Sequence, residues 1–424
     1  MRPTDLASPD RVAAVVRRHH RVLGLPEAPA TVELLDVRIR NPQLPDSPRC
    51  RGWATVRVPS PPGGPGRDDL VLLLHAGDEL PAGGTTLPGL PLRVWSFPHD
   101  PGLPALVPMT DLQRAEGLLP GGLAREHVTE VRVVRWQPGV SASLRCALVG
   151  PAGHSAVYAK VLAHGALLTV DDVQRWLHAQ SSEDLRVPEP LGADPVGGVL
   201  WSAEVDGCSL IDTLRCGDPT AVDRTAWRTG RCLAALHASA AVPRLRHVEP
   251  ADVVAEAAKK AAKVARAQPQ HDHAVRRLAG VVAEGLDRTS VAPGLLHGDC
   301  HVGQLLVTRE GPVLLDLDEM VTGDPAVDLA ELAVDLVLRD LPTGTVRRFL
   351  TLAGSSYGAA GGVPPMAGVL RGYAAAELLN RCYRHLRRPM PGWQVDLAVA
   401  LAGASDVLAG VDLVRPRLGS GVAA

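Results

Sequence analysis

LLHGDCHVGQLLV, residues 295–307, sets two histidines, an aspartate, a cysteine and a glutamine between two apolar runs. A loop this polar between hydrophobic flanks indicates either a metal site or a reaction centre. A metal site would use His297, Asp299 and His301, with Cys300 alongside. Alternating positions on one loop rarely converge on one tetrahedral ion, and the sequence offers no second cluster of ligands. The pattern therefore favours a reaction centre.

Carboxylate and amide groups recur downstream at spacings that suit phosphoryl transfer. Gln304 lies five residues after Asp299, and Asp316 lies 12 residues further on, at the end of the apolar run VLLD. Phosphoryl transfer needs one carboxylate to orient the attacking hydroxyl, and an amide oxygen with a second carboxylate to hold Mg²⁺ against nucleotide phosphates. Lys160 ends the predicted strand VYAK, where its ammonium group suits phosphate oxygens. We therefore predict a phosphotransferase.

The predicted elements follow the order of a two-lobed kinase. A helix is expected over 9–24, and alternating apolar residues then predict two groups of strands before a mostly helical remainder. The strands are expected at 31–40, 51–60, 68–76, 90–97 and from about 128 to 163, the helices at 226–239, 251–267 and 327–338, and two short strands within 303–318. We expect an α+β, protein-kinase-like fold with a β-rich N-lobe (126–206), a mainly helical C-lobe (207–424) and an additional N-terminal β-rich segment (1–125).

Three motifs in order carry a resemblance to a known family. HGDCHVGQLLV is followed by VLLDLDEMVTGDPAVDLAELA (313–333), and together they resemble the aminoglycoside phosphotransferase/choline kinase superfamily of small-molecule kinases. The superfamily pattern is HGD-x-H-x-x-N, then (I/L)D-(F/W)-(D/E), then GDP-x-x-DLA. The similarity covers roughly residues 128–340, and VPEPLG (187–192) and LAALHAS (233–239) fit between the motifs.

The resemblance implies roles for residues of the C-lobe. Asp299 matches the catalytic aspartate, and His297 the histidine that braces its loop. Asp316 matches the metal-binding aspartate, and Asp318 a second acidic position near the metal. Asp328 matches the DLA aspartate, whose expected task is to hold the loop.

Gln304 departs from this pattern, because asparagine is usual there. The amide oxygen survives one methylene further out, so Gln304 is still expected to bind the metal. The cofactors implied are Mg²⁺ and ATP, or GTP in its place. Lys160 matches the phosphate-binding lysine of the N-lobe, and Ser141 and Ser143 follow the turn that replaces a glycine-rich loop. Glu204, in the hinge-like run WSAEVDG (201–207), is a further nucleotide-binding candidate.

The amino-acid composition and net charge of the chain restrict the classes of molecule that it is expected to bind. The formal net charge of −2 argues against a protein that wraps nucleic acid. Seven scattered cysteines, never spaced as C-x-x-C, are typical of reduced thiols in a cytoplasmic protein. The first residues lack the apolar core of a secretory signal, and no apolar window reaches the length of a membrane span. We expect a cytoplasmic enzyme with a small-molecule hydroxyl acceptor and with neither nucleic acid nor membrane as a partner.

We expect the acceptor to be a sugar, an amino sugar or an antibiotic-like molecule. From residue 336 onward the chain has ten arginines, no lysine and five acidic residues. This basic excess, with Arg381, Arg384, Arg387 and Arg388 in one run, favours a neutral or anionic acceptor such as a sugar. The alternative is that these arginines only form a solvated helix face.

Two rival functions follow from the same sequence. The first is a catalytically inactive kinase-like module that binds nucleotide or a partner protein. Against it, the sequence contains every side chain expected from the superfamily pattern except the asparagine that Gln304 replaces. The second rests on GSSYG (354–358), which matches the G-x-S-x-G pattern of hydrolases with Ser356 as nucleophile. That pattern needs a strand before the serine, whereas RRFLTLA (347–353) is typical of a helix.

Overall fold

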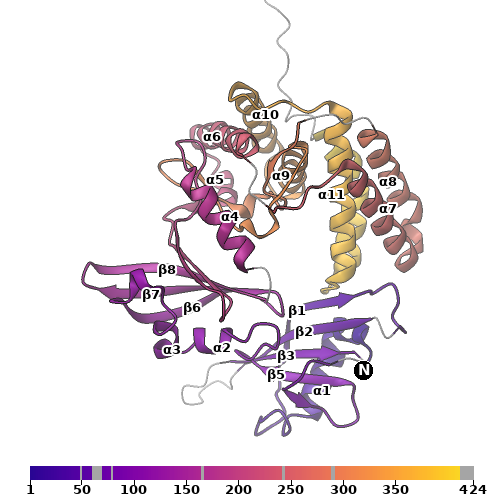
Figure 1. Ribbon diagram of the computed structural model, residues 1–424. Coiled ribbons are helices and arrows are strands. Elements are labelled where there is room, and N and C mark those ends of the chain that lie inside the picture. The colour runs from indigo at the N-terminus through magenta and orange to yellow at the C-terminus, as the bar shows by residue number, and fades with distance from the viewer. Residues whose placement is uncertain are drawn as a thin grey trace, which may run out of the picture. The chain divides into compact units, whose positions relative to one another are not determined.

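The computed structural model describes residues 1–47, 50–59, 69–77, 80–163, 167–240, 244–287 and 292–410 (Figure 1). The chain divides into two compact units. The first comprises Met1–Leu167, Leu191–Ser202 and Tyr383–Leu397, and the second comprises Leu168–Pro190, Ala203–Cys382 and Ala398–Ala424. The three-part division at residues 125 and 206 remains a prediction. No helix in the described ranges combines the length and apolar character needed to cross a bilayer.

The first sheet of the first unit is antiparallel and has the strand order β1-β2-β3-β5-β4. Its strands are β1 (Glu33–Arg40), β2 (Arg51–Val58), β3 (Leu70–Ala76), β4 (Thr85–Thr86) and β5 (Leu92–Ser96), preceded by η1 (Pro3–Ala7) and α1 (Pro9–Arg18). Val12 and Val16 lie one turn apart on α1 and are buried in the core of this sheet, as the helical periodicity predicts. The helix ends at Arg18 rather than at the predicted Gly24.

The second sheet has the order β6-β7-β8-β10-β9. Its strands are β6 (His127–Gln137), β7 (Ser141–Gly150), β8 (Gly153–Leu162), β9 (Pro190–Asp194) and β10 (Val199–Ala203). Along β7 every second residue is buried, because one face packs against a core and the other does not. The buried face shares its core with α2 (Leu106–Met109) and α3 (Leu112–Glu116), which η2 (Gly121–Leu123) follows.

The second unit is mainly helical. Its helices are α4 (Leu167–Ala179), α5 (Leu210–Cys216), α6 (Pro219–Ala238), α7 (Pro250–Ala267), α8 (Asp272–Leu286), α9 (Ala326–Leu338), α10 (Thr343–Ala359), α11 (Ala367–Arg387), α12 (Trp393–Ala402) and α13 (Ala404–Gly410), with η3 (Pro269–His271) between α7 and α8. Leu167 of α4, the residues of α11 from Tyr383 onward and the residues of α12 up to Leu397 are assigned to the first unit. Gly230 lets α6 approach α10 closely, since a Cβ atom there would lie 2.0 Å from the hydroxyl of Ser356.

Short strands frame the polar loop quoted above. β13 (Leu305–Val307) pairs antiparallel with both β14 (Pro312–Leu314) and β11 (Cys208–Ser209). β12 (Gly294–Leu296) pairs with β15 (Val321–Gly323). The single turns η4 (Val302–Gln304) and η5 (Leu317–Glu319) carry the chain between these strands. The two strands predicted within 303–318 are thus confirmed as β13 and β14, and the polar segment 297–304 lies between β12 and β13.

Candidate active site

The segment 297–304, here called the HGD loop, follows directly after β12. Gly298 adopts φ +77°, and a Cβ atom there would lie 2.2 Å from the carbonyl oxygen of Glu319. Only glycine fits this position without strain. The next residue, Asp299, has a side chain that is 41% exposed, so its carboxylate is accessible to a reactant. Asp299 therefore projects from a backbone that glycine allows to turn sharply.

Asp328 on α9 holds the start of the HGD loop. Its carboxylate is completely buried, and it accepts hydrogen bonds from the backbone N–H groups of His297 at 2.8 Å and Gly298 at 3.0 Å. His237 Nε2 lies 3.1 Å from the same carboxylate. Burial alone would raise the pKa of Asp328, but its hydrogen bond with His237 and the neighbouring charges lower that pKa below its usual value. The loop-holding role implied for Asp328 agrees with these contacts.

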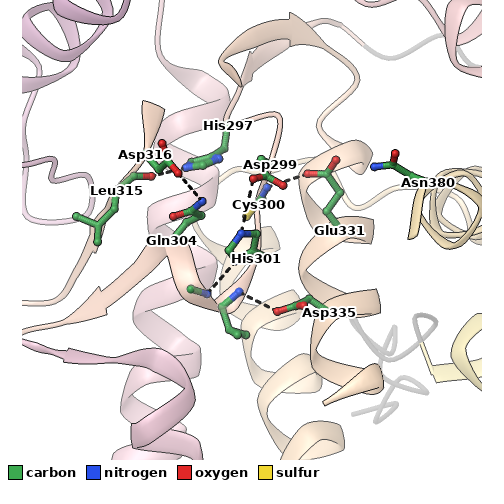
Figure 2. Close-up of polar contacts among 12 residues, drawn as sticks. His297, Asp299, Cys300, His301, Gln304, Leu315, Asp316, Glu331, Asp335 and Asn380 are labelled. Carbon is green, nitrogen blue, oxygen red and sulfur yellow. Dashed lines mark hydrogen bonds and ion pairs between the residues drawn. The ribbon is translucent and has the colours of Figure 1, made fainter. Parts of the chain in front are cut away.

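Two further carboxylates of α9 hold the rest of the loop. Glu331 accepts the N–H of Cys300 at 2.8 Å, and Asp335 accepts the N–H of Val302 at 3.2 Å (Figure 2). These residues lie three and seven positions after Asp328, so all three carboxylates share one face of the helix. The HGD loop is thus fastened to α9 along its length.

Histidines fix the remaining geometry of the loop. His297 is fully buried, and its Nε2 lies 2.8 Å from the carbonyl oxygen of Leu315, which it reaches as a donor. His301 Nδ1 accepts the N–H of Gly303 at 3.0 Å, which leaves the ring proton on Nε2. That Nε2 lies 3.6 Å from Oδ2 of Asp299. Burial lowers the pKa of His301 even though Asp299 raises it, so the ring is neutral near pH 7.

Gln304 and Asp316 meet as the sequence predicted. The side-chain amide nitrogen of Gln304 donates to Oδ2 of Asp316 at 3.1 Å (Figure 2). The backbone carbonyl of Gln304 accepts the N–H of Leu315 at 2.9 Å. Asp316 adopts φ +59° and ψ 62°, a left-handed conformation that is rare outside glycine and concentrates at functional sites. The structure therefore brings the two predicted metal ligands into contact.

The donor set suits Mg²⁺. One carboxylate and one amide oxygen, completed by phosphate oxygens and water, are the ligands that Mg²⁺ usually takes in nucleotide enzymes. Within the described ranges no three His, Cys, Asp or Glu side chains converge as they would for an ion held by protein alone. The remaining predicted ligand, Asp318, lies on η5 directly after Asp316 and Leu317. Burial and the charges of Asp299, Asp318 and Asp316 raise the pKa of Glu319, which indicates a concentration of negative charge here.

Three of the predicted nucleotide-binding residues, Ser141, Ser143 and Lys160, lie in the first unit, and Glu204 lies in the second. Ser143 on β7 is directly opposite Lys160 on β8, and Ser141 is opposite Leu162. Directly opposed residues of an antiparallel pair share a face, and so do alternate residues along a strand. Ser141, Ser143 and Lys160 therefore lie on one face of the second sheet. Glu204 is exposed and follows β10, where the chain passes from the first unit to the second. That Lys160 meets Asp299 across a cleft remains a prediction.

A cavity of about 680 Å³ opens beside the HGD loop. Gly298 and Leu296 line it near the loop, Glu331 lines it from α9, and residues of α7 and α11 line it as well. Five carboxylates and three cationic side chains are among its lining residues: Asp252, Glu256, Glu319, Glu331, Glu377, Arg246, Lys259 and Lys260. Burial and the neighbouring Glu377 raise the pKa of Glu331 well above its usual value. The cavity is thus a polar chamber with an excess of acidic groups.

The arginines of 381–388 do not line this cavity. Arg381 donates to Glu377 at 2.7 Å and to Asp335 at 3.0 Å, so its charge is neutralised within the protein. Arg388 bonds Asp36 at 3.2 Å in the first unit. Arg387 lies over the ring of Tyr383. The basic excess counted from the sequence therefore gives no support to an anionic acceptor.

The hydrolase interpretation of GSSYG is wrong. Ser356 lies inside α10, is completely buried, and donates its hydroxyl hydrogen bond to the carbonyl of Ala353 at 3.1 Å. A nucleophile elbow requires the serine to stand exposed on a tight turn between a strand and a helix. Asp324 of the GDP motif stabilises a turn before α9, because its side chain accepts the N–H of Ala326 at 2.9 Å.

Sequence reasoning missed Glu331, Asp335 and His237. Glu331 and Asp335 carried one usable signal, which is that acids at spacings of three and seven from Asp328 occur within an otherwise apolar helix. His237 belongs to the segment LAALHAS (233–239), which fits between the family motifs. Its hydrogen bonds to Asp328 and to the hydroxyl of Tyr357 join segments about a hundred residues apart in the chain. Only the tertiary structure reveals that connection.

Comparisons with known proteins agree with this geometry. Residues 125–369, more than half of the 424-residue chain, match the model of the phosphotransferase enzyme family. A comparison with curated protein sequences gave no match. Among solved structures, a choline/ethanolamine kinase family protein from Mesorhizobium loti has a TM-score of 0.51 at 19% identity, covering 72% of this chain and 98% of that chain.

Two further structures share the fold. Macrolide 2′-phosphotransferase type I has a TM-score of 0.50 at 17% identity, covering 69% of this chain and 96% of its own. A thermostable aminoglycoside phosphotransferase, solved with ADP and hygromycin B, has a TM-score of 0.50 at 15% identity, covering 70% and 96%. The predicted α+β, two-lobed fold is confirmed, and so is the predicted enzyme class, a small-molecule kinase. By its match over residues 125–369, the chain belongs to the phosphotransferase enzyme family.

Proposed function

We propose that the protein transfers the γ-phosphoryl group of ATP to a hydroxyl group of a small, amine-bearing acceptor. The observation that supports this most strongly is the HGD loop itself. Its backbone is fastened to α9 by three carboxylates, while Asp299 keeps an accessible carboxylate beside a cavity of about 680 Å³. Such preorganisation serves positioning, which is most of what phosphoryl transfer requires of a protein.

Asp299 would orient the acceptor and take its proton. The acceptor hydroxyl donates a hydrogen bond to the Asp299 carboxylate, which directs the oxygen lone pair at the γ-phosphorus. As the new P–O bond forms and the bond to the β-phosphate oxygen breaks, the hydroxyl proton passes to Asp299. His301 Nε2, 3.6 Å away, and His297, bonded to Leu315, hold the loop while this occurs.

Gln304 and Asp316 would hold Mg²⁺, with Asp318 nearby. A bound Mg²⁺ supplies neutralising charge for the nucleotide phosphates. The 3.1 Å contact between Gln304 and Asp316 keeps both side chains directed to one place. Lys160, Ser143 and Ser141 would bind the phosphates from the N-lobe sheet, and Glu204, which follows β10, would lie near the nucleotide. GTP in place of ATP, a cytoplasmic location, and the absence of nucleic-acid and membrane partners remain predictions.

Charge in the cavity favours an acceptor with an amino group. Five carboxylates face three cations there, and Lys259 and Lys260 each lie 3.9 Å from Glu256. Burial and the charge of Glu377 raise the pKa of Glu331, and Arg381 pairs with Glu377. An ammonium group that entered the cavity beside Glu331 would favour the ionised form of Glu331 and pair with it, so an amino sugar or an aminated antibiotic fits better than a neutral sugar.

A matched pair of acceptors tests the proposal. The protein is incubated with Mg-ATP and either glucose or glucosamine, and with other pairs that differ only by one amino group, and ADP and phosphorylated product are measured. We expect kcat/KM to be at least about tenfold higher for the amine-bearing member of the pair that is turned over. Equal or lower values for that member refute the acceptor class. Nucleotide binding without any product would favour the inactive module instead.

A further inference from the structure

A buried carboxylate in the first unit touches the turn that precedes the proposed nucleotide-binding strands. Asp100 lies between β5 and α2, and it is 4% exposed. Its Oδ1 accepts the N–H of Gly102 at 2.8 Å. Its Oδ2 accepts two hydrogen bonds, from the indole Nε1 of Trp136 at 2.9 Å and from the N–H of Gly139 at 2.8 Å. Asp100 thus joins the segment after β5 to the last part of β6 and to the middle of the β6–β7 turn.

The contact between this segment and the turn is close. Gly139 has φ +68°, and a Cβ atom on Gly102 would lie 2.6 Å from the Cα of Gly139. Phe97 packs against Trp136, with ring centroids 5.0 Å apart. Two glycines therefore let the backbone of 97–102 lie directly on the turn. A substitution by any larger residue at Gly102 would push the two apart.

Asp100 and Trp136 lie on the opposite face of the second sheet from Lys160. Trp136 is paired with Ala142, which is buried in the core of the second sheet, whereas Arg135 is paired with Ser143. Since neighbouring residues of a strand point to opposite faces, Trp136 and Asp100 lie behind the face that carries Ser143 and Lys160. Asp100 cannot touch a nucleotide bound on that face. Its influence must pass through the turn.

The buried Asp100 carboxylate is held by three N–H donors. Moving a carboxylate out of water is costly, and three N–H donors are needed to offset that cost. The two donors on Oδ2 lie in β6 just before the turn and in the middle of the turn, so the carboxylate restrains its conformation. In kinases the corresponding turn covers the nucleotide phosphates, and fixing it in advance reduces the entropy lost on binding.

We propose that Asp100 is a positioning residue for the nucleotide: it holds the β6–β7 turn in the conformation that receives the phosphates. The segment before the N-lobe thereby takes part in nucleotide binding without touching the nucleotide. This inference rests on the proposed function in one respect, that the nucleotide binds over Ser141, Ser143 and Lys160.

Asp100→Asn tests the proposal with almost no change in volume. An asparagine has one acceptor oxygen and cannot serve all three N–H groups, so the turn loses part of its support. We expect both the Kd of a Mg-bound, non-hydrolysable ATP analogue and the KM for ATP to rise about tenfold, with kcat and the acceptor KM within about twofold of the wild type. Hydrogen exchange at the Gly139 amide should accelerate.

Two variants separate positioning from general destabilisation. Asp111→Ala removes another aspartate of the same region, one that caps α3 by accepting the N–H of Arg114 at 2.9 Å. It should lower the melting temperature and leave the KM for ATP unchanged. Trp136→Phe removes one donor to Asp100 but keeps a ring beside Phe97, and should reproduce part of the rise in Kd.

The outcomes distinguish the two proposals. If the Asp100→Asn variant binds the ATP analogue as tightly as the wild type does and differs only by a lower melting temperature, the positioning role is refuted and the proposed function is not. A rise in nucleotide Kd for Asp111→Ala as large as that for Asp100→Asn refutes it as well. A wild-type protein that binds no nucleotide refutes the proposed function, and the role of Asp100 falls with it.

Discussion

The buried carboxylate of Asp328 is hydrogen-bonded to the backbone of His297: its Oδ2 accepts the His297 N–H at 2.8 Å. Because His237 also bonds this carboxylate, α6, α9 and the HGD loop share one buried polar group. Asp299 follows His297 by two residues, so the direction of the catalytic candidate depends on this bond. The arrangement couples the stability of the helical unit to the geometry of its proposed reaction centre.

Asp328→Asn should therefore harm both stability and activity. The variant keeps the volume but removes the charge that three hydrogen bonds stabilise. We expect the free energy of unfolding to fall by about 3 kcal/mol, as measured by urea denaturation. Since a displaced loop misplaces Asp299, kcat should fall about 100-fold. Asp340→Asn, an exposed aspartate just after α9, is the control and should change neither.

Glu331→Gln should change how stability depends on pH. The folded-state pKa of Glu331 is raised well above 4.5, so the folded protein keeps this proton to a higher pH than the unfolded chain does. The free energy of unfolding of the wild type therefore declines as pH rises above about 4.5. Glu331 contributes at most about 1.4 kcal/mol of this decline per pH unit. Glutamine keeps an oxygen for the Cys300 N–H and has no proton to lose. The variant should equal the wild type near pH 4 and exceed its stability near pH 8.

A constant difference between the two proteins across that pH range would contradict the assignment of Glu331 as a neutral carboxylic acid. Denaturation at several pH values makes the comparison. Its readout is the free energy of unfolding and needs no substrate.

Two helical glycines should respond in opposite ways to alanine. Gly230→Ala on α6 would place its Cβ atom 2.0 Å from the Ser356 hydroxyl and 2.1 Å from the Ala353 carbonyl, which forces α6 and α10 apart. We expect a loss of about 2 kcal/mol or more. Gly280→Ala on α8 meets nothing within 4 Å and should gain about 1 kcal/mol from helix propensity alone. Melting temperatures of both variants check this pair, and a stabilised Gly230→Ala would show that α6 and α10 pack less closely.

Gln304→Ala should weaken the response to Mg²⁺. It removes both the amide oxygen proposed as a metal ligand and the 3.1 Å bond that directs Asp316. The Mg²⁺ concentration for half-maximal activity should rise about tenfold, while kcat at saturating Mg²⁺ falls less. Gln270→Ala, on the exposed turn η3, is the matched control. An unchanged Mg²⁺ titration for Gln304→Ala would remove Gln304 from the metal site.

The sequence predicts most of the fold because its signals are local. Alternation along β7 and the pairing of β13 with β14 follow from residue order and turn chemistry alone. The end of α1 was predicted six residues late, at Gly24, since the turns that follow Arg18 remain compatible with a helical pattern. The contact between Gln304 and Asp316 was also foreseeable, because two short paired strands bring them together.

Interactions between distant segments were not foreseeable in the same way. Arg381 seemed available to an acceptor when arginines were simply counted, yet Glu377 and Asp335 neutralise it. The carboxylates of Glu331 and Asp335 belong to the loop only because α9 packs beneath it. Asp100 reaches the β6–β7 turn across 36 residues of chain, and its sequence context, HDPG, carries no sign of that contact. These bonds depend on packing, which a single sequence does not display.

The most direct test is a comparison of wild type and Asp299→Asn by ³¹P NMR, with Mg-ATP and an acceptor turned over by the wild type. The substitution keeps the size of the side chain and removes the group that accepts the hydroxyl proton. We predict a new phosphomonoester signal for the wild type, and a rate at least about 1,000-fold lower for the variant although it binds nucleotide equally well. A variant that forms the same phosphomonoester at a rate near that of the wild type would contradict the central role of Asp299.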